Sequence, residues 1–148
     1  INNPSFASKI INQGRKSRIY MLSAIDQNSP YIVPTQFESF SGLGGRSFNN
    51  ILRYQNIINP NIQVGALSTT RIYDGDAYGN LLGLDGLFKF SGGWKFELEY
   101  FRNSNKEPIS DWIDSDKNFG EYTVRLDGES FSGNALYSEL RRDTNTWR

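Results

Sequence analysis

The stretch WKFELEYFRN, from Trp94 to Asn103, determines the fold class that the sequence predicts. Four apolar residues occupy every second position: Trp94, Phe96, Leu98 and Tyr100. Three charged residues fill the positions between them: Lys95, Glu97 and Glu99. Because successive side chains of a β-strand point to opposite sides, the stretch predicts a strand with one apolar and one charged face.

The segment before this stretch shows the same alternation. The apolar residues that share one side are Leu82, Leu84, Phe88 and Phe90, and the charged residues opposite them are Asp85 and Lys89. The connection between the two segments is Ser91-Gly92-Gly93. A short link that contains glycine is typical of a hairpin. The sequence therefore predicts two antiparallel strands, at 79–90 and 94–103.

Similar alternation extends along the 148 residues and predicts an all-β chain. The expected strands are 5–12, 17–26, 46–56, 62–73, 79–90, 94–103 and 120–142, with another beginning at Thr146. The expected short links are 13–16, 57–61, 91–93 and 143–145, and the expected long links are 27–45, 74–78 and 104–119. Short and long links thus alternate, as short turns and long surface loops do in outer-membrane β-barrels.

Strand length also favours a membrane over water. Several expected strands reach ten or more residues, whereas strands of soluble proteins cluster near ~5–6 residues and a tilted strand crossing a bilayer needs ~9–11. We therefore expect an antiparallel, up-and-down transmembrane β-barrel. Residues 1–148 would supply about eight strands of one domain without an internal boundary. Because an unpaired strand cannot persist in lipid, the chain is expected to be a fragment of a larger barrel.

The two faces of such a barrel have different surroundings, because the apolar face meets lipid and the charged face meets a wet lumen. The residues expected to face lipid are Leu82, Leu84, Phe88, Phe90, Trp94, Phe96, Leu98 and Tyr100. The residues expected to face the lumen are Asp85, Lys89, Lys95, Glu97 and Glu99. The alternative is a soluble β-sandwich, in which the same apolar residues fill a core and the chain is a carbohydrate-binding module.

Composition argues against several classes of function. The chain has 16 Lys and Arg against 16 Asp and Glu, with no His and no Cys. A balanced charge provides no basic footprint for nucleic acid, and the lack of Cys removes thiolate metal sites. An enzyme would have to rely on carboxylates or on an activated Ser or Thr, and the spacing singles out no pair of acids. We expect neither catalysis nor nucleic-acid binding.

The loop at 104–121 contains the one arrangement that resembles a ligand site. Its spacing is D-x-D-x-N, which can place alternate oxygen atoms around Ca²⁺. The candidate calcium ligands are Asp111, Asp114, Asp116 and Asn118. Gly120 comes one place late for an EF-hand, and the bidentate Glu of such a loop is missing. These departures favour a solvated loop whose acids serve solubility, and calcium binding is the alternative. No other cofactor is expected.

Four stretches of sequence carry a family resemblance: SRIYMLSAIDQNSPYIVP (17–34), the segment 53–71 ending in VGALSTTR, GLDGLFKF (83–90) and LDGESFSGNALY (126–137). They resemble a Bacteroidota outer-membrane family in which a family-nine-like carbohydrate-binding module precedes a C-terminal β-barrel domain of unknown function. The resemblance implies a surface-exposed barrel in the outer membrane of a Gram-negative bacterium. Its surroundings would be membrane lipid or lipopolysaccharide and other outer-membrane proteins. The role of that barrel domain is uncharacterised, so the resemblance gives a location, and the role expected of a membrane barrel is that of a pore, a transport component or a scaffold in an outer-membrane assembly.

Overall fold

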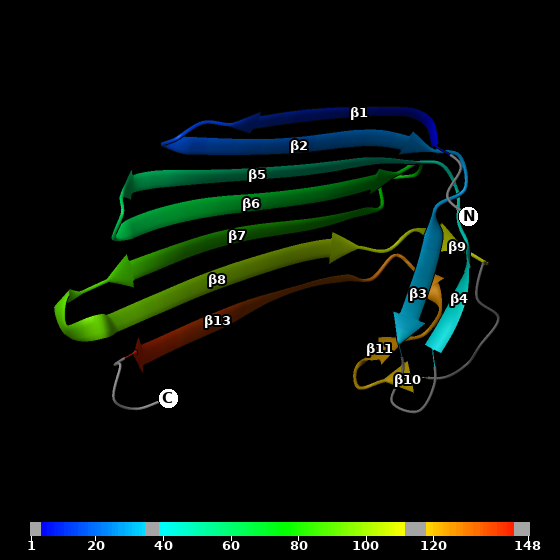
Figure 1. Cartoon of the computed structure of the whole chain (residues 1–148). Helices are drawn as coiled ribbons and strands as arrows, with labels where there is room; N and C mark the ends of the chain where they lie inside the picture. Colours follow the sequence, from blue (N-terminus) through cyan, green and yellow to red (C-terminus); the bar gives the residue numbers. More distant parts are fainter. Residues whose placement is uncertain (1–3, 35–38, 112–117, 144–148) are drawn as a thin grey trace.

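The computed structural model describes residues 4–34, 39–111 and 118–143. Seven long strands form its main sheet: β1 (Pro4–Gln13), β2 (Ser17–Asp26), β5 (Ser47–Asn59), β6 (Ile62–Tyr73), β7 (Tyr78–Lys89), β8 (Trp94–Lys106) and β13 (Ser130–Arg142). Every neighbouring pair is antiparallel, and the strands cross the sheet in chain order (Figure 1). The prediction of an all-β, antiparallel chain is therefore confirmed.

The sheet is open in the part of the chain that the structure describes. β1 forms one edge and β13 the other, and the two strands are not paired with each other (Figure 1). The strand expected from Thr146 lies outside the described residues, so the sheet has seven strands where about eight were expected.

The two ends of the sheet differ in their links. We call the end with links 14–16, 60–61 and 90–93 the turn end; the last of these contains the 3₁₀ turn η1 (Ser91–Gly93). The opposite end, with links 27–46, 74–77 and 107–129, is the loop end (Figure 1). Link 74–77 is no longer than link 90–93, so the predicted alternation of short and long links is wrong at that point.

Three small two-stranded sheets lie at the loop end: β3 (Pro30–Pro34) with β4 (Ser39–Leu43), β9 (Ile109–Ser110) with β12 (Leu126–Asp127), and β10 (Asn118–Phe119) with β11 (Tyr122–Thr123). The prediction of one strand over 120–142 is therefore wrong. Gly128, with a left-handed φ of 91°, interrupts it between β12 and β13, and Gly120, with a φ of 64°, lies in the turn between β10 and β11. Val124 and Leu126 alternate because they are buried within the loop.

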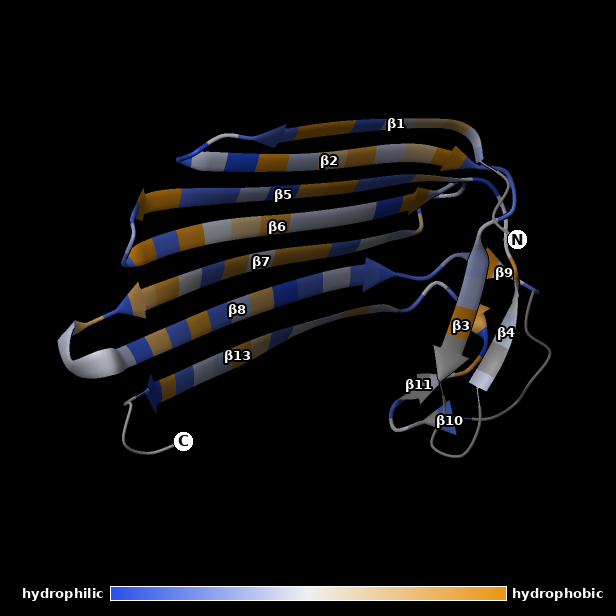
Figure 2. Ribbon diagram, in the orientation of Figure 1, coloured by the Kyte–Doolittle hydropathy of each residue, from blue (hydrophilic) through white to orange (hydrophobic). Residues whose placement is uncertain are grey.

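The register of the main sheet separates an apolar face from a polar face. On the apolar face, Phe88 is paired with Phe96 and Leu84 with Tyr100, and Tyr100 is paired in turn with Leu136. Figure 2 shows the resulting alternation of hydrophobic and hydrophilic positions along the strands. The charged residues of the polar face are Lys9, Arg18, Asp26, Arg53, Arg71, Asp85, Lys89, Lys95, Glu97, Glu99, Glu139 and Arg141, and apolar residues such as Leu22, Ile51, Leu87 and Phe101 share this face.

Little of the chain is buried. Among the described residues the buried hydrophobic side chains are Ala77, Val124 and Leu126. All three lie in links at the loop end, outside the seven long strands. On the apolar face, by contrast, Leu84 is 51 % exposed and Leu136 is 70 % exposed. The main sheet therefore has no hydrophobic core of its own, and its apolar face is uncovered.

Candidate functional site

The polar face carries a two-point ion pair near the turn end. Arg53 of β5 donates two hydrogen bonds to the carboxylate of Asp85 on β7, one of them from Nη2 to Oδ1 at 2.9 Å. The two strands are separated by β6, and Gly65 lies where the side chains cross. A Cβ atom at Gly65 would lie 2.5 Å from Asp85 Oδ2 and 2.7 Å from Arg53 Nη2. The missing side chain of Gly65 is therefore what allows the pair to form.

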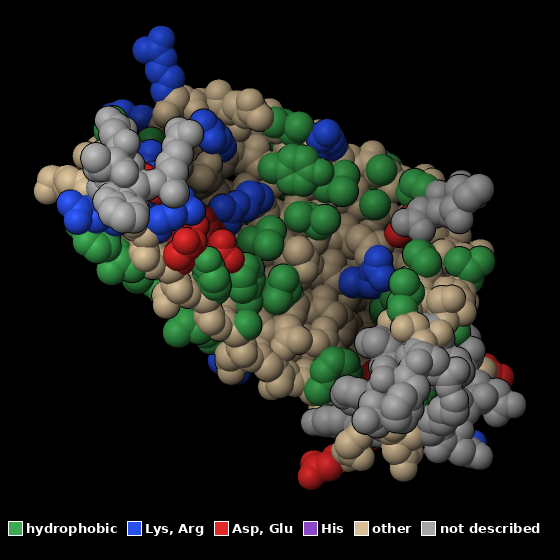
Figure 3. Space-filling view, turned by 60° about the horizontal axis from the view of Figure 1, so that its bottom comes forward, with side chains coloured by type: hydrophobic (Ala, Val, Ile, Leu, Met, Phe, Trp, Pro, Cys, Tyr) green, Lys and Arg blue, Asp and Glu red, His purple; other side chains and the backbone are tan. Residues whose placement is uncertain are grey.

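Other charges at the turn end are also compensated. Lys95 at the start of β8 forms an ion pair with Asp143. Arg141 of β13 lies 3.6 Å from Glu139 and 3.9 Å from Glu97. Figure 3 shows acidic and basic side chains gathered toward this end of the hollowed face. The turn end is thus a mixed-charge surface in which each of these cations has an acidic neighbour.

The loop end of the polar face has a buried polar network instead. Asp26 is 6 % exposed, and its carboxylate accepts a hydrogen bond of 2.7 Å from the side-chain amide of Asn49. The other atom of that amide, Oδ1, accepts a hydrogen bond from Arg71 Nε at 2.5 Å. The hydroxyl groups of Ser29 and Ser47 are buried and bonded to each other. This network attaches the base of the β3–β4 hairpin to the main sheet.

A hollow of about 610 Å³ lies beside this network. Its lining includes Ala7, Ala24, Ile51, Thr69, Arg71 and Gly79, which come from five neighbouring strands. A smaller hollow of about 190 Å³ lies nearer the turn end and is lined by Gln55, Gln63, Asp85, Glu97 and Glu99 among others. Both hollows are lined mainly from the polar face, and Figure 3 shows this face hollowed between its two ends. The sheet therefore curls toward its charged side.

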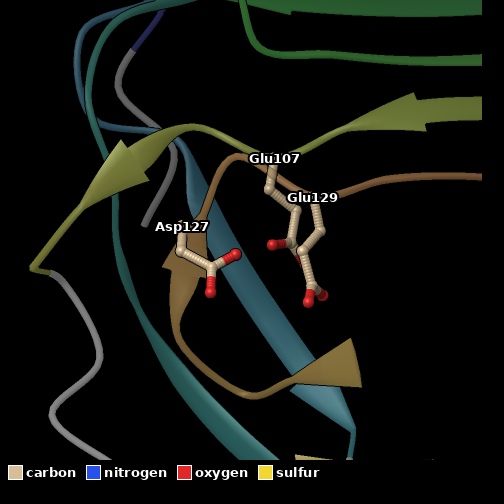
Figure 4. A group of neighbouring side chains, drawn as sticks. All are labelled: Glu107, Asp127 and Glu129. Carbon is tan, nitrogen blue, oxygen red and sulfur yellow. The ribbon is translucent and has the colours of Figure 1, made fainter. Parts of the chain in front are cut away.

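Three carboxylates meet outside the sheet, at the loop end. Glu107 follows β8, Asp127 belongs to β12, and Glu129 precedes β13; carboxylate oxygens of all three lie within 4.8 Å of one another. Figure 4 shows the side chains of Glu107 and Glu129 next to each other, with Asp127 beside them. Thr123 donates to two of these acids, from its hydroxyl to Asp127 at 3.0 Å and from its amide to Glu129 at 3.3 Å.

The environment of Glu107 favours its protonated form. Burial, together with the smaller effects of the neighbouring charges of Glu129 and Asp127, raises the pKa of Glu107 to about 7. Its Oε2 atom is shielded from solvent and accepts no hydrogen bond from the described residues. Three oxygen donors this close can share a proton or contribute to the oxygen shell of a divalent cation, which for Ca²⁺ needs ~6–8 ligands. The cluster alone provides too few.

The calcium site predicted from sequence is only partly within the described residues. Asp111 is exposed and follows β9, and Asn118 begins β10. Asp114 and Asp116 lie outside the described residues. The acids that the structure brings together at this end are a different set, Glu107, Asp127 and Glu129.

The residues assigned to two faces by sequence do occupy opposite faces of the sheet. The register joins Leu82, Leu84, Phe88, Phe96, Leu98 and Tyr100 on the apolar face. Trp94 lies on the same face of β8. Phe90, just after β7, is 58 % exposed. Asp85, Lys89, Lys95, Glu97 and Glu99 lie on the polar face.

Sequence analysis missed the residues that the fold brings together over long separations. Arg53 and Asp85 are 32 positions apart. The signal that could have pointed to their pairing is Gly65, because a glycine inside a strand often marks a close approach of neighbouring groups. Asn49, Arg71 and Glu107 gave no comparable signal, since each depends on pairing between distant segments.

Comparisons with known proteins add no identification: no protein family, curated protein or solved structure matches the chain. In the described part of the chain, no helix is long and apolar enough to cross a membrane. The family resemblance, the cellular location and the expected lack of catalysis therefore stay predictions.

Proposed function

We propose that this chain forms part of the wall of an outer-membrane β-barrel, where it serves as a pore, a transport component or a scaffold. The observation that carries the proposal is the direction in which the sheet curls. Its hollows lie on the charged face, and its uncovered face is apolar.

The direction of curling matters because it decides which face a closed sheet would enclose. A soluble barrel encloses its apolar side chains and exposes its polar ones. This sheet, continued in the same sense, would enclose Arg53, Asp85 and Glu99 and leave Leu84 and Leu136 outside. A polar interior with an apolar exterior is the arrangement of membrane-spanning barrels.

Strand dimensions support the same proposal. The seven strands contain 10 to 13 residues, which covers the ~9–11 residues that a tilted membrane strand needs. On β8 the apolar positions run from Trp94 to Tyr100, a length of about 20 Å at ~3.3 Å per residue. Beyond them the same face continues with Arg102 and Lys106. On β8 the apolar positions therefore give way to basic ones toward the loop end, whereas on β6 and β5 the same face stays apolar there, at Ile72 and Phe48.

The sheet edges set a further requirement. β1 and β13 each present a row of backbone N–H and C=O groups, and lipid offers no partner for such groups. The proposal therefore includes closure of the sheet by further strands, so that every backbone group is paired. Lipid and lipopolysaccharide would then contact the apolar face, and other outer-membrane proteins the loop end.

The experiment that tests the proposal is fractionation of the complete protein after expression in a Gram-negative host, with gel mobility compared before and after heating. We expect the protein in the outer-membrane fraction and a heat-dependent change in mobility, because closed barrels resist unfolding by detergent. A monomeric, β-rich protein that stays in the aqueous phase would contradict the barrel. It would favour the soluble β-sandwich, with the apolar face covered by a second sheet.

Two variants on β7 test which face of the sheet contacts lipid. Leu84→Arg places a charge on the apolar face, where we expect a cost of about 2–4 kcal/mol and reduced recovery in the membrane. Leu87→Arg places the same charge on the polar face, where Leu87 is paired with Glu97. We expect that variant to insert normally. Equal recovery of the two variants would contradict the assignment of the faces.

A further inference from the structure

We propose that the larger hollow at the loop end binds a small solute that carries one carboxylate, and that Arg71 is the residue that binds the carboxylate. The inference deepens the proposed function, on which it rests, by naming a class of solute for the barrel interior.

The hollow exists because Arg71 has small neighbours at the same level of the sheet. Ala7, Ala24, Asn49, Arg71 and Gly79 are paired in succession across β1, β2, β5, β6 and β7. All five contribute to the lining of the hollow. Its volume of about 610 Å³ is within the ~300–1,000 Å³ of small-molecule sites. A small organic molecule fits this space, whereas a folded partner does not.

The guanidinium group of Arg71 is held in place from one side. Its Nε donates to Asn49 Oδ1 at 2.5 Å, and its Nη1 lies 3.4 Å from both the carbonyl oxygen of Pro30 and the hydroxyl of Tyr73. The group also lies 5.9 Å from the centre of the Tyr73 ring. These contacts involve Nε and Nη1, so Nη2 keeps its donors for a ligand. A fixed guanidinium binds with a smaller loss of side-chain freedom than a mobile one.

Arg71 forms no direct ion pair with any acid that the structure describes. No described carboxylate lies within 4.0 Å of it, whereas Arg53, Lys95 and Arg141 each have at least one. Asp26 is connected to Arg71 only through the amide of Asn49. The guanidinium group of Arg71 is half-buried and lines the hollow, and the planar fork of arginine matches the two oxygens of a carboxylate.

The remaining lining defines the rest of the solute. Leu22, Ala24 and Ile51 provide an aliphatic wall, and Thr69 provides a hydroxyl. Asp26 also belongs to the lining, and its buried carboxylate would repel a second anionic group. The hollow therefore suits a monocarboxylate with a compact carbon skeleton better than a dicarboxylate or a neutral sugar.

The test measures binding of cyclohexanecarboxylate to the complete protein in detergent, by ligand-observed NMR, with neutral cyclohexanecarboxamide as the matched ligand. We expect saturable binding of the carboxylate and at least about tenfold weaker binding of the carboxamide, because a hydrogen-bonded ion pair is lost. Arg71→Gln should weaken carboxylate binding about tenfold and leave the carboxamide unchanged. Arg71→Lys should restore part of the affinity, since it keeps the charge but not the fork.

The control variant is Lys89→Gln, which removes one positive charge from the same face at the turn end. We expect it to bind the carboxylate like the parent protein. Equal binding of the two ligands, or an equal effect of Arg71→Gln and Lys89→Gln, would overturn the inference. Failure of binding in a protein that fractionates with the outer membrane would refute the site and leave the barrel. Arg71-dependent binding by a protein that proves soluble would refute the barrel and support the site.

Discussion

The charged side chains are arranged differently at the two ends of the polar face. At the turn end, cations and acids are paired directly, as in Arg53 with Asp85 and Lys95 with Asp143, and their side chains are partly exposed. At the loop end, Asp26 and Arg71 are connected through the amide of Asn49, and the acid is almost completely buried. At the turn end each of these cations contacts an acid directly, whereas at the loop end Arg71 contacts no described acid directly and lines a hollow.

The difference has an energetic consequence. Partly exposed ion pairs contribute little to stability, ~0–1 kcal/mol each, because water competes for both partners. A buried carboxylate that loses its hydrogen-bond donor costs more, because it has no access to water that could replace the donor. Substitutions of similar size should therefore be more harmful at the loop end than at the turn end.

The largest effect is expected from Asn49→Leu. The change keeps the volume of the side chain but removes two hydrogen bonds: the one that Asn49 donates to Asp26 and the one that it accepts from Arg71. We expect the free energy of unfolding, measured by urea titration of the detergent-solubilised protein, to fall by about 3 kcal/mol.

The matched control for this change is Gln55→Leu, on the same strand and face but at the turn end. Gln55 contacts Arg18 at 3.2 Å and Gln63 at 3.4 Å, and the contact with Arg18 is exposed. Its loss should cost less than about 1 kcal/mol. Equal losses for Asn49→Leu and Gln55→Leu would contradict the expectation that a lost hydrogen bond costs more stability at the loop end than at the turn end.

A smaller effect is expected from Gly65→Ala, which tests the direct pairing at the turn end. The added methyl group would lie within 2.7 Å of both Asp85 and Arg53 and would force their side chains apart. A gain of up to about 1 kcal/mol from replacing a strand glycine partly offsets this loss. We therefore expect a net loss of less than about 1 kcal/mol, measured by the same titration.

Gly79→Ala provides the comparison at the loop end. A Cβ atom at Gly79 meets only Asn105 Oδ1, at 3.1 Å, within 4 Å. We expect this variant to be as stable as the parent or more stable, because it gains strand propensity and breaks no ion pair. If Gly65→Ala were as stable as Gly79→Ala, the pair of Arg53 and Asp85 would not depend on the missing side chain.

The sequence allowed prediction of those parts of the fold that depend on local spacing. Alternation over 79–103 correctly predicted a hairpin and the faces of its strands, because the period of a strand is two residues. The same rule failed at 120–142, where Val124 and Leu126 alternate because they are buried in a loop. Periodicity identifies which side chains share a side, and it does not tell what covers them.

The β3–β4 hairpin and the candidate sites could not be predicted in the same way. Residues 27–45 were expected to form a long link, yet Pro30 and Pro34 lie in β3, whose single partner is β4. Proline is tolerated there because a strand with one neighbour uses fewer of its N–H groups. The contacts of Arg71 and the acids around Glu107 depend on which distant segments become neighbours, and local patterns do not contain that information.

The smallest expected effect concerns pH and the acids at the loop end. Burial and neighbouring acids raise the pKa of Glu107 from its ordinary 4.5 to about 7. The folded state therefore holds this proton more tightly than the unfolded state, so the contribution to stability is complete below about pH 4.5 and is lost as pH rises through about 7. We expect amide hydrogen exchange in 107–129, corrected for intrinsic rates, to become faster between pH 5 and 8 relative to the hairpin at 57–63.

Glu107→Gln separates this mechanism from a general effect of pH on the loop end. The amide is neutral at every pH, so the relative protection of 107–129 should no longer change between pH 5 and 8. The main-chain bond from Glu107 to the carbonyl of Glu129, 2.9 Å long, does not depend on the side chain and reports on the same segment. If its protection still declined with pH in the variant, the loosening would come from another group.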